Sequence, residues 1–272
     1  MKKIIIYTCV WKRPAITRIC FEGIKRLIRQ LPYHVSAHVC VSEKWAQEMA
    51  DEFGFTHTFT ENKPLGRKHN KGLFDIIGRD FDYVLHLGSD NILDIRLLEM
   101  YEPYIKKKLD LIGCGQAYVT DGSTTKRINR EPFMVGAGRM FSKRILKRAG
   151  FRRKIIFKKD SKDYWVNDSE WQQLEEREEC KMTEQRDFML WDDSINEGLD
   201  ADSHYRMIFA RASNKCVHLE PHQAYAADLK SRTNIHPFEG MECDGEAVPV
   251  SDIDIPEMQA YLQYIQMLTP VI

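Results

Sequence analysis

The sequence lacks any cysteine pair with the spacing of a metal-binding or redox motif. It contains seven cysteines, and none of them forms a Cys-x-x-Cys pair. Several lie within apolar runs such as YTCVW and NKCVHL. An odd number of scattered cysteines fits neither a disulfide framework nor a zinc ribbon, and is typical of a reducing cytoplasm. We therefore expect a cytoplasmic protein.

The sequence also lacks long hydrophobic runs, and its formal net charge is zero. No stretch reaches the roughly 18 apolar residues of a membrane-spanning helix. The N-terminal stretch MKKIIIYTCVWKRP breaks at Trp11, Lys12 and Arg13 without a small-residue cleavage site, so we expect no signal peptide. Lys and Arg together number 40, as do Asp and Glu, so the overall charge predicts no polyanionic partner.

The chain does contain enough apolar residues for a packed core. Of its 272 residues, 43% are hydrophobic and 29% are charged, which favours a globular domain over disorder. There is no internal repeat and no low-complexity segment. This length allows one large α/β domain with an appendage.

Strand-like and helix-like patterns alternate over the first 120 residues. Strands are predicted at 3–11, 34–42, 55–62, 81–88 and 110–119. Helices are predicted at 15–30, 44–54, 67–79 and 95–108. This alternation predicts a mainly parallel sheet with helices on both faces.

The alternation weakens after residue 120. We expect a loop at 121–131, a strand or turn at 132–142, a short helix at 143–150 and a polar stretch at 160–190. Further along, we expect a helix within 191–212, a strand at 214–219 and an extended tail at 220–272.

Polar residues follow three of the predicted strands. The stretch FDYVLHLGSDNIL ends its apolar run at Gly88, Ser89 and Asp90. Trp11 and Arg13 follow the first strand, and Ser42 and Glu43 follow the second. Ligands of such sheets bind beyond the carboxyl ends of the strands, so a binding site is predicted there.

The strand that ends in an Asp-containing turn resembles the GT-A glycosyltransferases. In that family the fourth strand ends in an Asp-x-Asp motif, which holds a divalent cation on the diphosphate of a nucleotide sugar. Here the motif reads Gly88-Ser89-Asp90, so the first Asp is missing and the last one remains. The resemblance implies a GT-A-like fold, and the missing Asp weakens the implied metal site.

Four other stretches, in the same order along the chain, resemble parts of this family. YTCVWKRP is similar to its first strand and nucleobase loop, and PLGRKHNKGL is similar to its loop-to-helix segment near the nucleotide. VGAGRMFSKRIL resembles the glycine-rich strand that faces the donor sugar, and MLWDDSINEGLD resembles the helix start with the acidic catalytic residue. The resemblance covers roughly residues 3–235.

The resemblance implies a donor site for a nucleotide sugar, with UDP as the usual nucleotide. It assigns donor binding to Thr8, Trp11, Arg13, Glu43, Lys68, Asn70, Ser89, Asp90, Gly136, Gly138 and Lys230. Among these, Arg13, Lys68 and Lys230 are cations that could meet phosphates.

The implied cofactor is Mn²⁺ or Mg²⁺, because a divalent cation neutralises a diphosphate leaving group. Asp90 would supply one ligand, and either His218 or His222 would supply another. For an inverting transfer a carboxylate must deprotonate the acceptor hydroxyl. Asp193 is the favoured base and Asp192 the alternative, at a helix start whose dipole keeps a carboxylate ionised.

Each of these residues also has a structural explanation. Asp90 and Asn91 precede a predicted helix, and both residue types cap helices well. Asp192 and Asp193 could likewise cap a helix at 194–209. The other candidates could be turn, core, strand or solvated residues, namely Gly136, Gly138, Trp11, His218, His222, Lys68 and Asn70.

A basic segment at 143–159 bears on the acceptor. It contains nine cations and no acid. Clusters of this kind contact phosphate backbones, and interleaved aromatic residues can contact an exposed base. We expect the acceptor to contact Arg152, Arg153, Lys154 and Trp165. The alternative is a solvated face balanced by the acidic run at 174–179.

The compact chain resembles GT-A-like enzymes of tailed bacteriophages, which glycosylate hydroxymethylated pyrimidines in DNA. A duplex substrate would require extrusion of the target base. This resemblance implies an acceptor in phage DNA and a place in the host cytoplasm. A bacterial envelope saccharide or lipid-linked sugar is the alternative acceptor.

Two other classes stay open. A nucleotidyltransferase would share the half-sheet but should carry a glycine-rich loop after the first strand, where this chain has VWKRPAIT. A non-catalytic nucleic-acid-binding protein would explain the basic segment but not the polar strand ends.

The expected organisation is one catalytic domain at 1–240, with a nucleotide-binding half at 1–120 and an acceptor half at 121–240. A C-terminal extension at 241–272 would pack on it.

Overall fold

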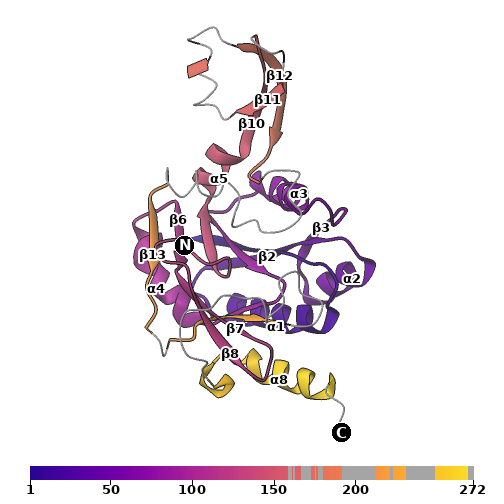
Figure 1. Cartoon of the computed structure of the whole chain (residues 1–272), viewed down its shortest axis with the longest axis vertical. Coiled ribbons are helices and arrows are strands. Elements are labelled where there is room, and N and C mark those ends of the chain that lie inside the picture. Colours follow the sequence, from indigo (N-terminus) through magenta and orange to yellow (C-terminus); the bar gives the residue numbers. More distant parts are fainter. Residues whose placement is uncertain are drawn as a thin grey trace.

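The computed structural model contains three sheets (Figure 1). It describes residues 1–158, 161, 163–166, 173, 174, 176, 180–191, 212–220, 223–230 and 249–268. Within these residues, no helix is long and apolar enough to cross a membrane.

The central sheet has seven strands in the order β13-β6-β9-β4-β1-β2-β3. The strands are β1 (Lys3–Cys9), β2 (His34–Val41), β3 (Thr56–Phe59), β4 (Tyr83–Gly88), β6 (Leu111–Cys114), β9 (Arg139–Ser142) and β13 (Asn214–Val217). All neighbours in it are parallel except β9, which runs antiparallel to both β4 and β6. The prediction of a mainly parallel α/β sheet is confirmed.

Helices cover both faces of this sheet. They are α1 (Pro14–Gln30), α2 (Lys44–Phe53), α3 (Leu65–Ile77), α4 (Ile95–Lys106) and α5 (Lys143–Gly150). Ile4 of β1 packs in one core with Phe21 of α1, whereas Ile5 packs in another with Leu73 of α3. Successive strand residues point to opposite faces, so the two cores lie on opposite sides of the sheet. The predicted two-sided arrangement is therefore confirmed.

The predicted strand at 110–119 is in fact two strands in different sheets. β6 ends at Cys114, and β7 (Gln116–Thr120) belongs to a four-stranded sheet. Gly115 lies at the break, where its carbonyl accepts a hydrogen bond from the Arg130 backbone at 2.8 Å. A Cβ at this position would collide with the Glu131 side chain, so a larger residue would force that side chain to move where the chain changes sheets.

Two further expectations are wrong. Part of the predicted loop at 121–131 forms β8 (Thr125–Asn129), and the predicted extended tail contains β14 (Ala226–Leu229) and α8 (Glu257–Leu268). β14 lies between β5 (Asn91–Leu93) and β7 in the order β5-β14-β7-β8. These short strands are stabilised by pairing with distant segments, which local periodicity does not reveal.

A three-stranded antiparallel arm projects from the body beyond α5 (Figure 1). It consists of β10 (Phe151–Phe157), β11 (Asp163–Val166) and β12 (Cys180–Phe188). Ile155, Val166 and Cys180 form a small buried core of its own. The arm occupies much of the stretch that the sequence describes only as basic and polar.

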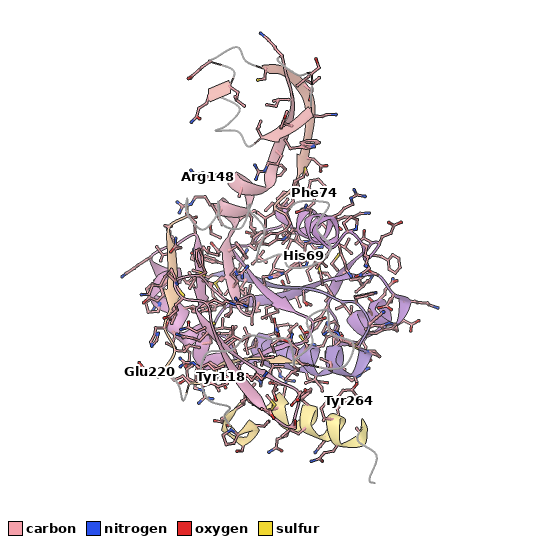
Figure 2. The ribbon with its side chains drawn as sticks, in the orientation of Figure 1. His69, Phe74, Tyr118, Arg148, Glu220 and Tyr264 are labelled. Atoms are coloured by element: carbon pink, nitrogen blue, oxygen red, sulfur yellow. The ribbon has the colours of Figure 1, made fainter. Side chains whose placement is uncertain are left out.

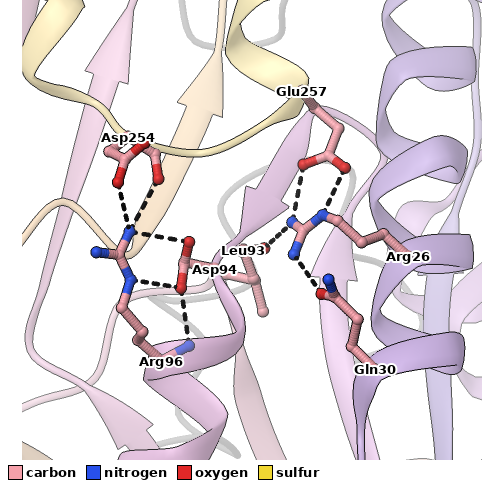
Figure 3. A network of polar contacts seen from close by, with 7 residues as sticks. All are labelled: Arg26, Gln30, Leu93, Asp94, Arg96, Asp254 and Glu257. Atoms are coloured by element: carbon pink, nitrogen blue, oxygen red, sulfur yellow. Dashed lines mark hydrogen bonds and ion pairs between the residues drawn. The ribbon is translucent and has the colours of Figure 1, made fainter.

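The helix α8 is attached to α1 by a buried ion pair (Figure 3). Arg26 donates to both carboxylate oxygens of Glu257, at 2.7 and 2.8 Å, and to the Leu93 carbonyl at 2.7 Å. The Arg26 and Glu257 side chains are 11% and 8% exposed. Removing one partner of such a pair leaves the other charge buried and uncompensated.

We therefore expect Glu257→Gln to lower the free energy of unfolding by about 3 kcal/mol, since it leaves the Arg26 guanidinium without its counter-charge. Urea denaturation measures this change. Glu48→Gln is the matched control, because the Lys44–Glu48 pair is exposed and should contribute little. An equal effect of both variants would contradict this role of the buried pair.

Candidate functional site

A tight turn follows β1 and carries two residues in the left-handed region. Lys12 and Arg13 have φ values of 57° and 56°. Non-glycine residues rarely adopt this conformation, and such strain is often found at functional sites. Pro14 then begins α1 with its fixed φ. This geometry directs the Arg13 side chain onto the end of β4.

At the end of β4, Arg13 contacts both residues of the Ser-Asp turn. Its guanidinium donates to Asp90 Oδ2 at 2.6 Å and to Ser89 Oγ at 3.2 Å. The Arg13 and Asp90 side chains are 13% and 14% exposed. Burial by itself would raise the pKa of Asp90, but Arg13 and Lys230 outweigh it and hold that pKa below its usual value. Asp90 is therefore ionised at neutral pH.

The structural explanation of Asp90 as a helix cap is wrong. Asp94 is the N-cap of α4, and its carboxylate accepts a hydrogen bond from the Arg96 backbone at 2.8 Å. Asn91 instead accepts a hydrogen bond from the Gly88 backbone at 2.7 Å, which closes the turn after β4. The Asp90 carboxylate thus takes no part in capping α4.

A second carboxylate lies beside Asp90. β14 pairs with β5 so that Asp228 is opposite Asn91, and the Leu229 amide donates to the Asp90 carbonyl at 2.8 Å. The Asp228 carboxylate pairs with Lys230 Nζ at 2.7 Å. Burial and the Asp90 charge outweigh this pairing and raise the pKa of Asp228 to about 7.

Lys230 is among the residues predicted from the sequence, but Asp228 is not. The available signal was the alternation in AADLK, which puts Asp228 and Lys230 on the same face of a strand. The proximity of Asp228 to Asp90 depends on β14 pairing with β5, which no local pattern indicates.

The two carboxylates fit a divalent cation. Asp228 Oδ1 is buried and has no hydrogen-bond partner within the part of the chain that is described. Mg²⁺ is usually held by one or two carboxylates together with substrate phosphates, so Asp90 and Asp228 are the residues at this edge that could hold such a cation. The described ranges contain no cluster of three or more His, Cys, Asp or Glu with metal-binding geometry.

The histidines named as possible metal ligands are placed differently. His218 Nδ1 lies 2.8 Å from Glu131 Oε1 and 3.0 Å from Gln116 Nε2, and its side chain is 58% exposed. These partners belong to a separate polar cluster near β7. His222 lies outside the described residues.

The ends of β1 and β2 are joined by Glu43. Its Oε2 accepts a hydrogen bond from the Lys12 backbone at 2.6 Å. The Lys12 ammonium lies 4.3 Å from the centroid of the Trp11 ring. Glu43 and Trp11, both named as donor-binding residues, are therefore on neighbouring strand ends and partly exposed.

Lys68 supports the turn after β1 from inside the protein. Its Nζ donates to the Val10 carbonyl at 2.6 Å and to Asn62 Oδ1 at 3.0 Å. The residue is 1% exposed, and burial lowers its pKa. In this geometry Lys68 positions the turn.

Asn70 holds the chain just before the predicted catalytic acids. Its side chain donates to the Trp191 carbonyl at 2.7 Å and accepts from the Trp191 amide at 2.9 Å. Asp192 and Asp193 follow directly but lie outside the described residues.

Thr8, at the end of β1, is fully buried, and its hydroxyl has no partner in the described structure.

The glycine-rich turn before β9 packs against β4. Gly138 has a φ of 79°, and its amide donates to the His86 carbonyl at 3.1 Å. A Cβ here would lie 3.2 Å from Leu93, so both conformation and space favour glycine. Gly136 is partly exposed in the same turn.

Several basic side chains of the segment 143–159 are paired within the protein or buried. Lys143 donates to the Arg79 carbonyl, Arg144 pairs with Asp110 at 2.8 Å, and Arg152 is only 4% exposed. Arg152, which the sequence suggests as an acceptor-binding residue, is thus largely enclosed by the protein.

The exposed cations lie on α5 and on the arm. Lys147, Arg148 and Lys158 are exposed, and Arg148 sits at the base of the arm (Figure 2). Lys154 is half-buried and lies opposite Trp165 in the β10–β11 pair. The backbone of Arg153 pairs with that of Val166. The arm thus combines cations with partly exposed aromatic residues.

No family model and no curated protein matches the sequence. Solved structures with a partly similar fold include TarS 1–349 from S. aureus, with 13% identity, a TM-score of 0.39, and coverage of 54% of this chain and 48% of that one. Mannosyltransferase PcManGT from Pyrobaculum calidifontis, solved with GDP-Man and Mn²⁺, has 11% identity, a TM-score of 0.39, and coverage of 54% and 46%. The chain thus matches about half the length of each.

A synthase also has a partly similar fold. The 4-diphosphocytidyl-2C-methyl-D-erythritol synthase from Anaerococcus prevotii has 9% identity and a TM-score of 0.42, with coverage of 81% of this chain and 90% of that one. Because these identities and TM-scores are low, a choice between sugar transfer and nucleotidyl transfer depends on the residues of this chain.

The raised pKa of Asp228 predicts a pH-dependent cost in stability. The folded state binds more protons than the unfolded state between about pH 4 and about pH 7, so this contribution to stability falls as the pH rises through that window. Asp228→Asn mimics the neutral form. We expect it to unfold at nearly the same temperature as the wild type near pH 4, and to be more stable than the wild type by about 3–4 kcal/mol at pH 8, because folding raises the pKa of Asp228 from about 4 to about 7.

Thermal unfolding across this pH range tests the expectation. Asp254→Asn is the control, because the Asp254 side chain is 90% exposed and its removal should give no pH-dependent difference. A constant offset between Asp228→Asn and the wild type would contradict the proposed titration.

Proposed function

We propose that this chain is a GT-A-like, metal-dependent glycosyltransferase. It would move a sugar from a nucleoside diphosphate sugar, with UDP as the favoured nucleotide, to an acceptor hydroxyl. The observation that carries the proposal is the charge cluster of Arg13, Asp90, Asp228 and Lys230 at the carboxyl ends of β1 and β4. Ligands of parallel α/β sheets bind at this edge.

The cluster suits a diphosphate group. A divalent cation bound by Asp90 and Asp228, Mn²⁺ or Mg²⁺, would neutralise the charge that develops on the leaving diphosphate. Arg13 and Lys230 can exchange carboxylate oxygens for phosphate oxygens, since both groups accept charge-assisted hydrogen bonds. Glu43 and Trp11 lie at neighbouring strand ends, where they would contact the nucleoside.

The general base of the transfer is proposed to be Asp193, with Asp192 as the alternative. The hydrogen bonds between Asn70 and Trp191 support this assignment, because they anchor the preceding residue to α3. A general base must lie within hydrogen-bond reach of the acceptor hydroxyl. Fixing Trp191 limits where the following carboxylates can lie.

The favoured acceptor is a hydroxymethylated pyrimidine in DNA, as in phage enzymes that act in the host cytoplasm. The arm supports this choice, since Lys147, Arg148 and Lys158 are exposed and Tyr164 is 41% exposed. Cations would contact phosphates, and an aromatic ring could stack on an extruded base. An envelope saccharide or lipid-linked sugar is the alternative acceptor.

A nucleotidyltransferase is the second candidate, since the 4-diphosphocytidyl-2C-methyl-D-erythritol synthase has a partly similar fold. The turn after β1 argues against it, because Lys12 and Arg13 occupy positions where a glycine-rich loop would be expected. The released product separates the two reactions. Sugar transfer releases nucleoside diphosphate, whereas nucleotidyl transfer releases pyrophosphate.

We expect Asp90→Asn to lower turnover of a nucleotide sugar by about 10²-fold or more, because the variant keeps the shape of the side chain but loses its charge. Release of nucleoside diphosphate from a panel of nucleotide sugars with Mn²⁺ measures this effect. Titration with Mn²⁺ in the presence of UDP, followed by electron paramagnetic resonance, should show that Asp90→Asn binds the ion more weakly than the wild type does.

Asp254→Asn is again the control and should keep both activity and ion binding, because Asp254 lies on the surface near α8. Full turnover of Asp90→Asn with unchanged Mn²⁺ dependence would refute the assignment of Asp90.

DNA binding by the arm and α5 is tested by charge reversal of Lys147, Arg148 and Lys158. Each lost phosphate contact should reduce the slope of log K against log salt concentration by about 0.9. Fluorescence anisotropy with a duplex, measured over a range of salt, determines the slope. Reversal of Arg29 and Lys107, which are exposed on other elements, is the control.

Hydrolysis of the donor should remain in the charge-reversed variant, because the donor site lies at the strand ends. If the wild-type protein shows no salt-sensitive affinity for DNA at low ionic strength, the saccharide acceptor becomes the better proposal.

A further inference from the structure

Two cysteines lie side by side at the end of β1 and β2. Cys9 and Cys40 are in register in this parallel pair. Neighbouring strands are about 4.8 Å apart, which lies within the range of Cα separations that a disulfide spans. Cys9 is partly exposed, whereas Cys40 is fully buried. Cys9 is therefore the more solvent-exposed residue of the pair.

The surroundings of Cys9 favour a thiolate. The Tyr7 hydroxyl donates to the His69 carbonyl at 3.1 Å and lies 3.2 Å from the Cys9 sulfur. Cys40, His69 and Lys68 lower the pKa of Cys9 and outweigh its burial, which would raise that pKa. Thiols next to cations or hydrogen-bond donors are the reactive ones in proteins.

The titratable and charged groups around this sulfur come from four elements. They are Tyr7 of β1, His38 and Cys40 of β2, His86 of β4, and Lys68 and His69 of α3. Burial lowers the pKa of His38 to about 4 and that of His86 well below its usual value, so neither ring is charged at neutral pH.

We propose that Cys9 is a peroxide-reactive thiol and that Cys40 resolves its oxidised form to a reversible disulfide. The Cys9 thiolate attacks one oxygen of hydrogen peroxide, so that an S–O bond forms, the O–O bond breaks and hydroxide leaves as water after protonation. The Cys40 sulfur then attacks the Cys9 sulfur, the S–O bond breaks and a second water leaves. Overall, two thiols lose two electrons and two protons, and one peroxide is reduced to two waters.

The pair is linked to the turn that carries Arg13. The Val10 amide donates to the Cys40 carbonyl at 2.9 Å, and the Val10 carbonyl accepts from Lys68 at 2.6 Å. A Cys9–Cys40 bond would draw the Cys9 sulfur away from Tyr7 next to this turn. Oxidation would thereby alter the turn that carries Arg13, although neither Arg13 nor Asp90 would itself be oxidised.

Alkylation kinetics of the reduced full-length protein test the reactivity of Cys9. Cys216 is the matched control within the same molecule, because it is also partly exposed but burial raises its pKa to about 11. At pH 6.5 we expect iodoacetamide to modify Cys9 at least about 10-fold faster than Cys216, as followed by peptide mass spectrometry. The rate at Cys9 should change little between pH 6.5 and pH 8, whereas that at Cys216 should rise with pH.

Peroxide treatment tests the resolving step. An equimolar amount should produce a Cys9–Cys40 disulfide that dithiothreitol reverses. In Cys40→Ser, the reaction should stop at a Cys9 sulfenic acid, which dimedone traps. Equal alkylation rates at Cys9 and Cys216 would overturn the proposal, even if Cys40→Ser did not fold. Peroxide treatment that leaves both cysteines of the wild type reduced would overturn it as well.

Discussion

The contact between Arg13 and Asp90 is the interaction on which the candidate site depends. It joins the turn after β1 to the turn after β4 at 2.6 Å, and both side chains are largely buried. Buried charges must be paired, so each of these turns constrains the other. The left-handed conformation of Lys12 and Arg13 is part of the same constraint, because it directs the guanidinium back over the sheet.

A second pair of charges extends this contact into the four-stranded sheet. Asp228 and Lys230 are brought to Asp90 by β14, which pairs with β5 immediately after the Ser-Asp turn. The helix α8 supports this strand, since the Tyr261 hydroxyl donates to the Lys230 carbonyl at 2.7 Å and to the Thr120 carbonyl at 3.1 Å. The C-terminal region thus positions a site made mainly by the N-terminal half.

The charge cluster of Arg13, Asp90, Asp228 and Lys230 is unfavourable for one of its own members. Asp228 is held where burial and the Asp90 charge raise its pKa to about 7, which disfavours its ionised form. Perturbed carboxylates of this kind are more frequent at functional sites than elsewhere. In the proposed function, a diphosphate with its cation would bring new charges to both carboxylates and both basic residues.

The alternating strands and helices of the first 110 residues can be predicted from local sequence, because each has a clear apolar period. The local sequence also indicated Arg13, Ser89 and Asp90, because they follow such strands directly. Long-range contacts set the break at Gly115, the pairing of β14 with β5, and hence the position of Asp228. They also decided that Arg152 is buried while Arg148 is exposed. These features depend on contacts between segments far apart in the chain, which local periodicity does not encode.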